Sequence, residues 1–377
     1  MNTSGTDDNV PAWEDGATIA LPALAQDIAA DVCVVGLGGS GLSAVHELLT
    51  LGQNVVGIDA GIVGGGAAGR NGGFLLAGTA RFYNEAVATL GRERARAIYQ
   101  LTLDELDRIT AETPELVRRV GSLRIAASAE EEADCALQLA AMRADDFRVQ
   151  PYVGPEGTGL LFPDDGAFEP LARCRELAHR AVARGARLHE HTRAIACEPG
   201  VVRTSCGTIR CRRTIVAVDG RLELLLPELT GRVRTARLQM LGTAPALDVD
   251  VPRPVYRRWG YDYWQQRPDR SVVLGGVRDE FVDAEWTDDA EPTAAVQARL
   301  DEVLRDIVKT QAPVVRRWAA SVSYSSGILP LLAEVRPDVW AIGGYSGTGN
   351  VLGALYGRIV SQLAVTGVSA SAAPFIA

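Results

Sequence analysis

The spacing of apolar residues changes between residues 31 and 58 and predicts a strand, a helix and a second strand. Residues 31–35 are a short, mainly apolar run that is typical of a buried strand. Residues 40–51 place leucine and valine at helical spacing, and residues 54–58 are again mainly apolar. Because a helix commonly joins two parallel strands, this order predicts a β–α–β unit.

The turn between the first strand and the helix matches the pattern G-x-G-x-x-G. Its glycines allow a tight turn, close approach of the backbone to a pyrophosphate and close packing of the helix on the strand. Asp59 lies 23 positions after Gly36, close to the offset expected for a carboxylate that accepts from a ribose hydroxyl. We therefore expect a dinucleotide to bind here. The residues expected to contact it are Gly36, Gly38, Gly39, Ser40, Gly41, Asp59 and Ala60.

A second unit of this kind is predicted near the other end of the chain. Residues 339–342 read as a strand, residues 343–350 as a glycine-rich loop, and the following residues through 363 as a helix. A glycine-rich turn into a helix N-terminus favours an anion or a polar carbonyl group. Two such units at opposite ends of the chain imply one discontinuous domain, with a second domain formed by the middle.

The middle of the chain is predicted to alternate between helices and strands. Helices are expected over residues 85–120 (with a break near Pro114), 130–147, 169–185 and 291–309, a strand over 186–196, a hairpin over 201–213 and a turn-rich connector over 159–168. Residues 232–276 are β-rich and aromatic. The fold class that follows is α/β: a discontinuous Rossmann-like domain with a second α+β domain built on an antiparallel β-sheet.

Composition excludes several classes of function. A net charge of −9 argues against nonspecific nucleic-acid binding, and no apolar run is long enough to span a membrane. The six cysteines contain no C-x-x-C pair, which favours a reduced, cytoplasmic protein and gives no sign of a metal site. Lys309 is the single lysine, so a mechanism that needs a lysine must use it.

Several segments together resemble the D-amino-acid oxidase-like (DAO) family of FAD-dependent oxidoreductases. The chain is most similar to the glycine oxidase and gamma-glutamylputrescine oxidase type. The segments that carry the resemblance are VVGLGGSGLSAVHEL, GGGAAGRNGG, LLFPDDGAFEPLARCRELAHRAVARGARLHEHTRA, TIVAVDG, VVLGGVRD and AIGGYSGTGN. They extend from about residue 31 to residue 363.

The resemblance implies FAD as the cofactor. It places Asp59 at the adenosine ribose, Ala194 in the strand that meets the adenine, Arg70 to Gly73 beside the flavin ring and Gly344 to Asn350 at its pyrimidine end. The further residues that it assigns to the cofactor are Arg70, Asn71, Gly72, Gly73, Ala194, Ala217, Gly220, Gly344, Tyr345, Ser346, Gly347, Thr348, Gly349 and Asn350. The FAD-binding domain is then expected over residues 1–80, 155–225 and 318–377, and the substrate domain over 81–154 and 226–317.

The sequence departs from the family pattern in ways that bear on the chemistry. No cysteine follows Cys211, so the cysteine linkage of some relatives is impossible and the FAD is expected to be noncovalent. Thr348 replaces a frequent histidine, Val351 replaces a substrate-binding lysine, and Lys309 lies outside the segment that supplies an oxygen-activating lysine. The electron acceptor is therefore left open between oxygen and another compound.

The implied reaction is oxidation of the C–N bond of a small amine or amino acid by hydride transfer to the flavin. The aromatic cluster of residues 256–264 is the candidate pocket, because aromatic faces hold amines and an arginine fork pairs a carboxylate. The candidate catalytic residues are Tyr345, Tyr261, Tyr263, Arg258 and Arg278. The alternatives are an NAD-dependent dehydrogenase, a flavoprotein that oxidises a hydroxy acid, and a non-catalytic flavin-binding subunit.

Overall fold

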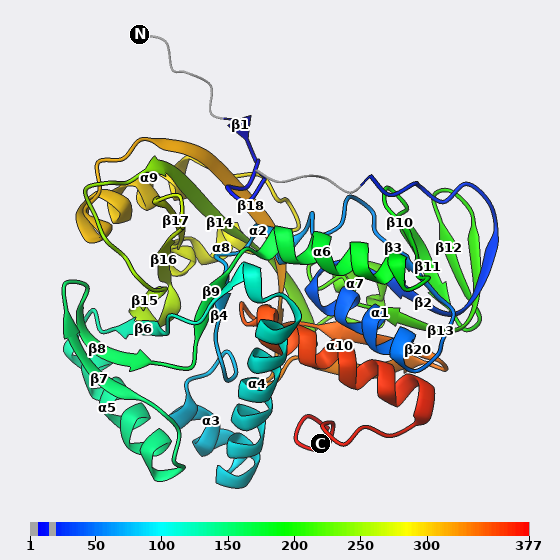
Figure 1. Ribbon diagram of the computed structural model, residues 1–377, viewed down its shortest axis with the longest axis horizontal. Coiled ribbons are helices and arrows are strands. Elements are labelled where there is room, and N and C mark those ends of the chain that lie inside the picture. Colours follow the sequence, from blue (N-terminus) through cyan, green and yellow to red (C-terminus); the bar gives the residue numbers. More distant parts are fainter. Residues whose placement is uncertain (1–6, 15–19, 377) are drawn as a thin grey trace.

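The computed structural model describes residues 7–14 and 20–376, and its centre is a doubly wound parallel sheet (Figure 1). Five strands of this sheet run parallel: β2 (Ile28–Val35), β3 (Val55–Ile58), β10 (Arg187–His189), β13 (Thr208–Val216) and β20 (Val339–Gly343). Their spatial order is β10-β3-β2-β13-β20. In chain order this is 3-2-1-4-5, the arrangement of dinucleotide-binding domains.

Antiparallel strands extend the parallel sheet on one side. β11 (Ala194–Glu198) and β12 (Val201–Thr204) form a meander with the first half of β13, and β19 (Leu331–Arg336) pairs with β20. β13 is long enough to pair with β12 early and with β20 late, while β2 lies along its other edge. The predicted hairpin around Gly207 is confirmed as β12 and β13.

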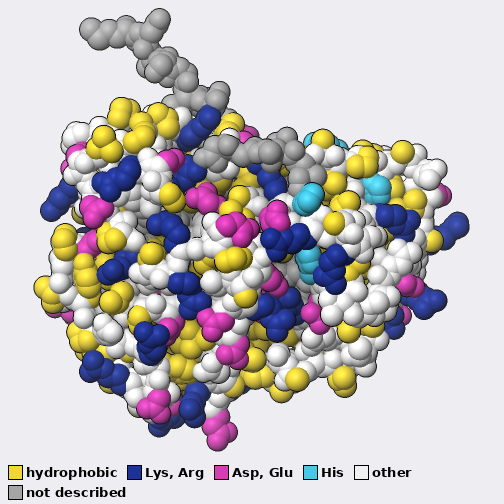
Figure 2. All heavy atoms as spheres, in the orientation of Figure 1, with side chains coloured by type: hydrophobic (Ala, Val, Ile, Leu, Met, Phe, Trp, Pro, Cys, Tyr) yellow, Lys and Arg dark blue, Asp and Glu magenta, His cyan; other side chains and the backbone are white. Residues whose placement is uncertain are grey.

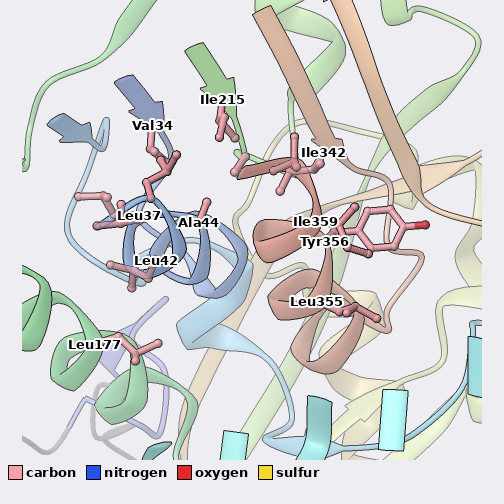
Figure 3. Packing of buried hydrophobic residues seen from close by; sticks show 14 of the residues in the cluster. Val34, Leu37, Leu42, Ala44, Leu177, Ile215, Ile342, Leu355, Tyr356 and Ile359 are labelled. Carbon is pink, nitrogen blue, oxygen red and sulfur yellow. The ribbon is translucent and has the colours of Figure 1, made fainter. Parts of the chain in front are cut away.

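Three helices cover one face of the parallel sheet: α1 (Gly39–Thr50), α6 (Pro170–Ala183) and α10 (Gly349–Thr366). Figure 3 shows Leu42 of α1, Leu177 of α6 and Ile359 of α10 packed near Val34 and Ile215 of the strands. Each such fully buried leucine or isoleucine contributes roughly 1.5–3 kcal/mol through burial of apolar surface. The helices come close because Gly357 has no side chain: a Cβ there would lie 2.3 Å from the Ser40 carbonyl oxygen.

A nine-stranded sheet forms the second large layer, seen at the left of Figure 1. Its order is β1 (Asp7–Asp8), β18 (Val314–Ser325), β14 (Val233–Pro245), β17 (Ser271–Gly276), β16 (Asp262–Gln266), β15 (Val255–Arg257), β6 (Ser122–Ile125), β8 (Gly157–Phe162) and β7 (Gln150–Gly154). All neighbours are antiparallel except β1 with β18 and β15 with β6. The predicted fold class is confirmed.

The remaining elements join the two sheets or cover the second one. They are α2 (Ala67–Arg70), α3 (Tyr83–Leu90), α4 (Arg92–Glu112), α5 (Ala129–Ala144), α7 (Leu222–Leu225), α8 (Val282–Glu285) and α9 (Ala294–Val303), with a small sheet of β4 (Phe74–Leu75), β9 (Gly166–Phe168) and β5 (Val117–Arg118). β18 runs across the predicted domain boundary at residue 318, and the boundaries themselves stay predictions.

Three predictions of secondary structure are wrong. The helix expected over 85–120 is two helices, α3 and α4, separated at Gly91, and residues 117–118 form the strand β5. Residues 159–168 are not a turn-rich connector: they contain the end of β8, which pairs with β6 and β7, and all of β9. Residues 186–196 form two strands instead of one. The chain turns between β10 and β11 because the His191 and Thr192 amides donate to the carbonyl oxygens of Gly61 and Asp59, at 2.8 and 2.7 Å. These are tertiary contacts that the spacing of apolar residues does not encode.

The surface carries charges of both signs. Figure 2 shows acidic and basic side chains interspersed over the visible face, without a large region of one sign. Within residues 7–14 and 20–376, no helix is long and apolar enough to cross a bilayer.

Candidate functional site

A cavity of about 1420 Å³ lies between the two large sheets and contains most of the predicted site. It exceeds the roughly 300–1,000 Å³ of a typical small-ligand pocket, as a site for a dinucleotide and a substrate together requires. Its wall includes the predicted residues Gly36, Gly38, Gly39, Ser40, Asp59, Ala60, Arg70, Asn71, Gly72, Ala194, Ala217, Gly220, Tyr261, Tyr263, Arg278 and Tyr345 to Asn350. Gly41, Gly73, Gly344 and Arg258 lie behind the wall.

Two glycines of the turn at the start of α1, Gly36 and Gly41, have no room for a side chain. A Cβ on Gly36, whose φ is +100°, would lie 2.7 Å from the Ala217 carbonyl oxygen. A Cβ on Gly41 would lie 1.9 Å from the Gly36 carbonyl oxygen. No side chain caps the N-terminus of α1, so its first amides are available to an anion from the cavity. This turn therefore fits a pyrophosphate.

Asp59 closes the same end of the cavity. Its Oδ2 accepts from the Leu37 amide at 2.8 Å and its Oδ1 from the Gly61 amide at 2.9 Å. Burial raises the pKa of Asp59, and these two amide donors oppose that rise. Beyond it the wall continues with Ala194, Ile195 and Leu224, and the last two are 62% and 59% exposed. Such apolar side chains suit the faces of an adenine ring, and sequence analysis missed both.

The two glycine-rich loops that are far apart in the sequence meet at the middle of the cavity. The side-chain amide of Asn71 donates to Asn350 Oδ1 at 3.0 Å, and that of Asn350 donates to Asn71 Oδ1 at 3.1 Å. Asn350 also donates to the Phe74 carbonyl oxygen, and Asn71 Oδ1 accepts from the Gly73 amide, both at 2.8 Å. The backbone of each loop is therefore fixed relative to the other.

Asp219 fixes the C-terminal glycine-rich loop, residues 343–350, through hydrogen bonds to its backbone. Sequence analysis missed Asp219 as a site residue. Its Oδ1 accepts from the amides of Gly344 (2.8 Å) and Tyr345 (3.4 Å), and its Oδ2 from that of Ser323 (3.1 Å). Burial raises the pKa of Asp219 to about 6, against the effect of these donors. An Asp-Gly pair directly after a strand was the available signal, because such a pair often begins a fixed turn.

Aromatic rings line the part of the cavity next to Gly72. Phe74, Tyr256 and Tyr263 lie with ring centroids 5.1 to 6.3 Å apart. A Cβ on Gly72 would be 3.3 Å from the ring of Tyr263, so that ring lies directly over the loop. Burial raises the pKa of both tyrosines, which keeps their hydroxyl groups neutral. Tyr261, in contrast, lies at the rim and is 42% exposed.

The two candidate arginines differ in what their charge faces. Arg278 is 92% buried, and its guanidinium lies over the rings of Trp286 (4.1 Å) and Tyr324 (4.6 Å). Its Nε and one terminal nitrogen are buried and have no hydrogen-bond partner among the described residues. These two nitrogens are closed off from the cavity, but Arg278 as a residue lines the cavity wall and no described carboxylate pairs with it, so the cation fits a ligand carboxylate.

Arg258 has no such freedom. Its guanidinium pairs with Asp279 at 2.6 Å, Glu280 at 2.7 Å and Asp262 at 3.3 Å, and it is absent from the cavity wall. Arg278 is therefore the candidate arginine in the cavity wall that no described carboxylate pairs, whereas Arg258 belongs to an ion-pair network outside that wall. Spacing in the sequence does not separate the two, because both come directly after a predicted β segment within the β-rich region.

An arm of the cavity runs from the aromatic rings between α3, α4 and β6. Tyr99, Ser122, Arg124, Gln138 and Asp165 line it, and sequence analysis missed them all. Asp165 accepts from Ser122 Oγ at 2.6 Å and from the Ala77 amide at 3.0 Å, and burial raises its pKa to about 7. Arg124 is paired with Asp134 and Gln138 and stacks on the ring of Phe82.

Lys309 and Cys174 differ in their position relative to the cavity. Lys309 follows the π-helical turn Leu304–Val308 and is not part of the cavity wall. Cys174 touches the wall beside Gly64, whose amide bonds to the Leu37 carbonyl oxygen next to the α1 turn. In the part of the chain that the structure describes, no three His, Cys, Asp or Glu side chains are grouped closely enough to hold a metal ion.

Known proteins resemble this chain over most of its length. A family model described as FAD dependent oxidoreductase (DAO) matches residues 31–363. The chain is 27% identical over 367 residues to a probable oxidoreductase OrdL of Rhizobium meliloti (strain 1021), covering 89% of this chain and 83% of the relative. It is 26% identical over 368 residues to the gamma-glutamylputrescine oxidoreductase of Escherichia coli (strain K12), covering 90% and 84%.

Solved structures share the fold. A glycine oxidase from Geobacillus kaustophilus superposes with a TM-score of 0.75 at 21% identity, over 92% of this chain and 98% of that chain. An L-proline dehydrogenase from P. horikoshii gives a TM-score of 0.73 at 19% identity, over 93% and 96%. Both likenesses concern the arrangement of the chain, since the identities are low.

Proposed function

Because this chain belongs to the DAO family of FAD-dependent oxidoreductases, we propose that it oxidises the C–N bond of a small amine or amino acid. FAD, when bound, accepts the hydride of the substrate carbon. The neutral amine thereby loses a hydride, which carries two electrons, and becomes a protonated imine, which water hydrolyses to a carbonyl compound and a free amine or ammonia. The NAD-dependent alternative is overturned by the family match.

The observation that carries the proposal is the buried guanidinium of Arg278 beside a cavity lined by aromatic rings. Arg278 binds the carboxylate of the substrate through the part of its side chain that lines the cavity, since no described carboxylate neutralises its charge. Phe74, Tyr256 and Tyr263 exclude water from the amine carbon and orient it toward the loop at Gly72. No general base is required when the amine binds in its neutral form, so these residues position the substrate and need not carry a proton.

The fit to FAD rests on the two glycine-rich loops, the α1 turn and Asp59. We propose that Asp59 binds the adenosine ribose and that the α1 turn binds the pyrophosphate. Asn71 and Asn350 hold the two glycine-rich loops in place around the flavin. The flavin is held noncovalently. Cys174 lies by Gly64, at the α1 end of the cavity, and burial raises its pKa to about 11, so its thiol stays neutral.

The electron acceptor is a compound other than oxygen in this proposal. Lys309, the single lysine, is outside the cavity wall, so no lysine ammonium stands near the flavin to stabilise reduced oxygen. A flavoprotein dehydrogenase of a hydroxy acid is the second candidate, because Arg278 would pair the carboxylate of such a substrate equally well. We further propose a cytoplasmic location from the six free cysteines.

Anaerobic reduction of the bound flavin tests the proposal. The purified protein is expected to be yellow, with two flavin absorption bands, and to release FAD on heating. A panel of amines, amino acids and hydroxy acids is then added without oxygen, and bleaching is followed at the longer-wavelength band. Bleaching by amines or amino acids supports the proposal, and bleaching by hydroxy acids alone supports the second candidate. No bleaching by any member contradicts both and indicates a non-catalytic flavin-binding subunit. Slow return of colour in air supports the dehydrogenase.

A further inference from the structure

A short segment near the N-terminus lies against the loop Arg70 to Gly73. We call residues 9–14 the N-terminal strap. The two residues before it form β1, which pairs in parallel with Arg316 and Arg317 of β18 (Figure 1). The Asn9 amide continues this pairing by donating to the Arg317 carbonyl oxygen at 2.9 Å. The strap therefore enters from the edge of the second sheet and reaches the cofactor loop of the first domain.

Asn9 binds the side chain of Arg70. The Arg70 guanidinium donates to the backbone oxygen of Asn9 at 2.7 Å and also to its side-chain Oδ1, and its Nε donates to the Ala319 carbonyl oxygen at 2.8 Å. Asn9 Oδ1 also accepts from the Ala319 amide at 3.0 Å. The charge of Arg70 is thus directed into the strap and β18, so Arg70 reaches the cavity with its backbone and not with its guanidinium.

Trp13 binds the next residue of the loop. Its indole nitrogen donates to the Asn71 carbonyl oxygen at 2.8 Å, and the side chain is 97% buried. Its Cη2 atom lies 3.0 Å from the position of a Cβ on Gly73, so the ring covers that glycine. Arg267 fixes the strap in turn by donating to the Ala12 carbonyl oxygen at 2.8 Å and lying 5.0 Å over the Trp13 ring.

The strap also forms part of the cavity. Pro11 and Glu14 belong to its wall, and Glu14 pairs with Arg175 of α6. The strap therefore contacts the second sheet, the loop 70–73 and a helix of the first domain. No prediction from the sequence gave it a role.

We infer that the N-terminal strap is a positioning element of the FAD site, in which Asn9 and Trp13 hold the loop Arg70 to Gly73 in its cofactor-binding conformation. The loop contains two consecutive glycines, which lose more conformational freedom on ordering than other residues. If the loop is ordered in only a fraction of the molecules, the apparent affinity for FAD is reduced to that fraction of its intrinsic value. The strap orders the loop before the cofactor arrives. This inference requires FAD but is independent of the substrate and of the reaction proposed above.

Titration of the full-length apoprotein with FAD tests the inference. Trp13→Phe removes the indole donor and keeps a ring, and Asn9→Ala removes the side-chain acceptor for Arg70. Each is expected to weaken FAD binding by roughly three- to tenfold, the effect of one buried hydrogen bond. Each is also expected to shift the absorption bands of the bound flavin, which a general loss of stability would not do. The matched control is Trp264→Phe, the same change in a buried tryptophan of β16 outside the cavity wall.

Two further results separate this inference from the proposed function. Thermal unfolding of each apoprotein shows whether a variant is folded. If Trp13→Phe is not folded, the FAD affinity of Asn9→Ala alone tests the inference. Unchanged FAD affinity and spectra in the folded strap variants, or an equal loss in Trp264→Phe, overturn the inference while the proposed function stands. A wild type that binds FAD but is bleached by no amine contradicts the proposed function, and the strap is still judged by the titration.

Discussion

Asn71 and Asn350 form a reciprocal pair of amide hydrogen bonds, at 3.0 and 3.1 Å, between positions 279 residues apart in the chain. Each side chain uses its remaining capacity on the backbone of the first loop, Asn350 at Phe74 and Asn71 at Gly73. One pair of identical side chains therefore sets the distance between the two loops that border the cavity. An aspartate at either position would place two acceptors face to face.

Asn350→Ala is expected to weaken FAD binding and lower the free energy of unfolding by about 1–3 kcal/mol, because the Phe74 carbonyl oxygen loses the donor Asn350 and Asn71 keeps only its hydrogen bonds within its own loop and α2. Calorimetric titration of the apoprotein and chemical denaturation measure the two quantities. The control is Gln362→Ala, which removes another side-chain amide from α10 where it donates to Glu47 at 2.8 Å. Equal FAD affinity of the two variants would contradict the role given to the pair.

Two glycines of the α1 turn are expected to respond differently to alanine. A Cβ on Gly41 would meet the Gly36 backbone at 1.9 Å, whereas a Cβ on Gly39 would meet nothing within 4 Å. Gly41→Ala should therefore destabilise the apoprotein by about 1–3 kcal/mol or more through backbone displacement, and Gly39→Ala should stay within about 0.5 kcal/mol of wild type. Urea denaturation of both apoproteins checks this. A similar loss for both would show that the turn is not tightly packed.

Arg278→Met is expected to discriminate between substrates. For an amino acid, kcat/KM should fall by an amount that corresponds to a loss of about 1.5–3 kcal/mol of transition-state stabilisation, since a charge-assisted hydrogen-bonded pair is lost. For the corresponding amine without a carboxylate, kcat/KM should change little. Arg258→Met serves as the control, because Arg258 lies outside the cavity wall and is paired with the carboxylates of Asp262, Asp279 and Glu280. Equal losses for both kinds of substrate would contradict the assignment of the carboxylate to Arg278.

Asp165 is expected to make stability fall as pH rises. Its pKa is raised from 3.8 to about 7 by burial, so between these values the folded protein keeps a proton that the unfolded chain releases. The contribution of Asp165 to the free energy of unfolding is present in full below about pH 4. It decreases by at most about 1.4 kcal/mol per pH unit as the pH rises and is lost by about pH 7. Asp165→Asn keeps both hydrogen bonds and should remove this loss.

Denaturation at pH 5, 6, 7 and 8 measures the difference between wild type and Asp165→Asn. The control is Asp248→Asn, because the Thr310 hydroxyl and the Gln311 amide lower the pKa of Asp248. The contribution of Asp248 is lost only as pH falls below its ordinary value of 3.8, so its curve should run parallel to wild type over this range. A parallel curve for Asp165→Asn would show that Asp165 is ionised in the folded protein.

The site was predictable where it depends on local geometry. The α1 turn, Asp59 and the loop 343–350 follow from the order of strand, glycines and helix, because each glycine is required by a turn within a few residues. The residues between the two sheets were not predictable in the same way. Asp165 and the strap residues act on segments far from them in sequence, and no local pattern marks them. Asp219 is marked by an Asp-Gly pair after a strand, but its partners Ser323 and Gly344 lie more than 100 residues away.

The sequence by itself determined the dinucleotide unit and the class of fold, because hydrophobic period and glycine spacing are properties of short segments. The prediction of FAD as the cofactor rested on the resemblance to the DAO family. Tertiary structure alone decided between Arg258 and Arg278. Both follow β segments in the sequence, but three carboxylates surround the first and none pairs with the second within the described residues. It also brought Trp13 onto Asn71, since a contact between segments 58 residues apart is made by packing and not by any local preference of the chain.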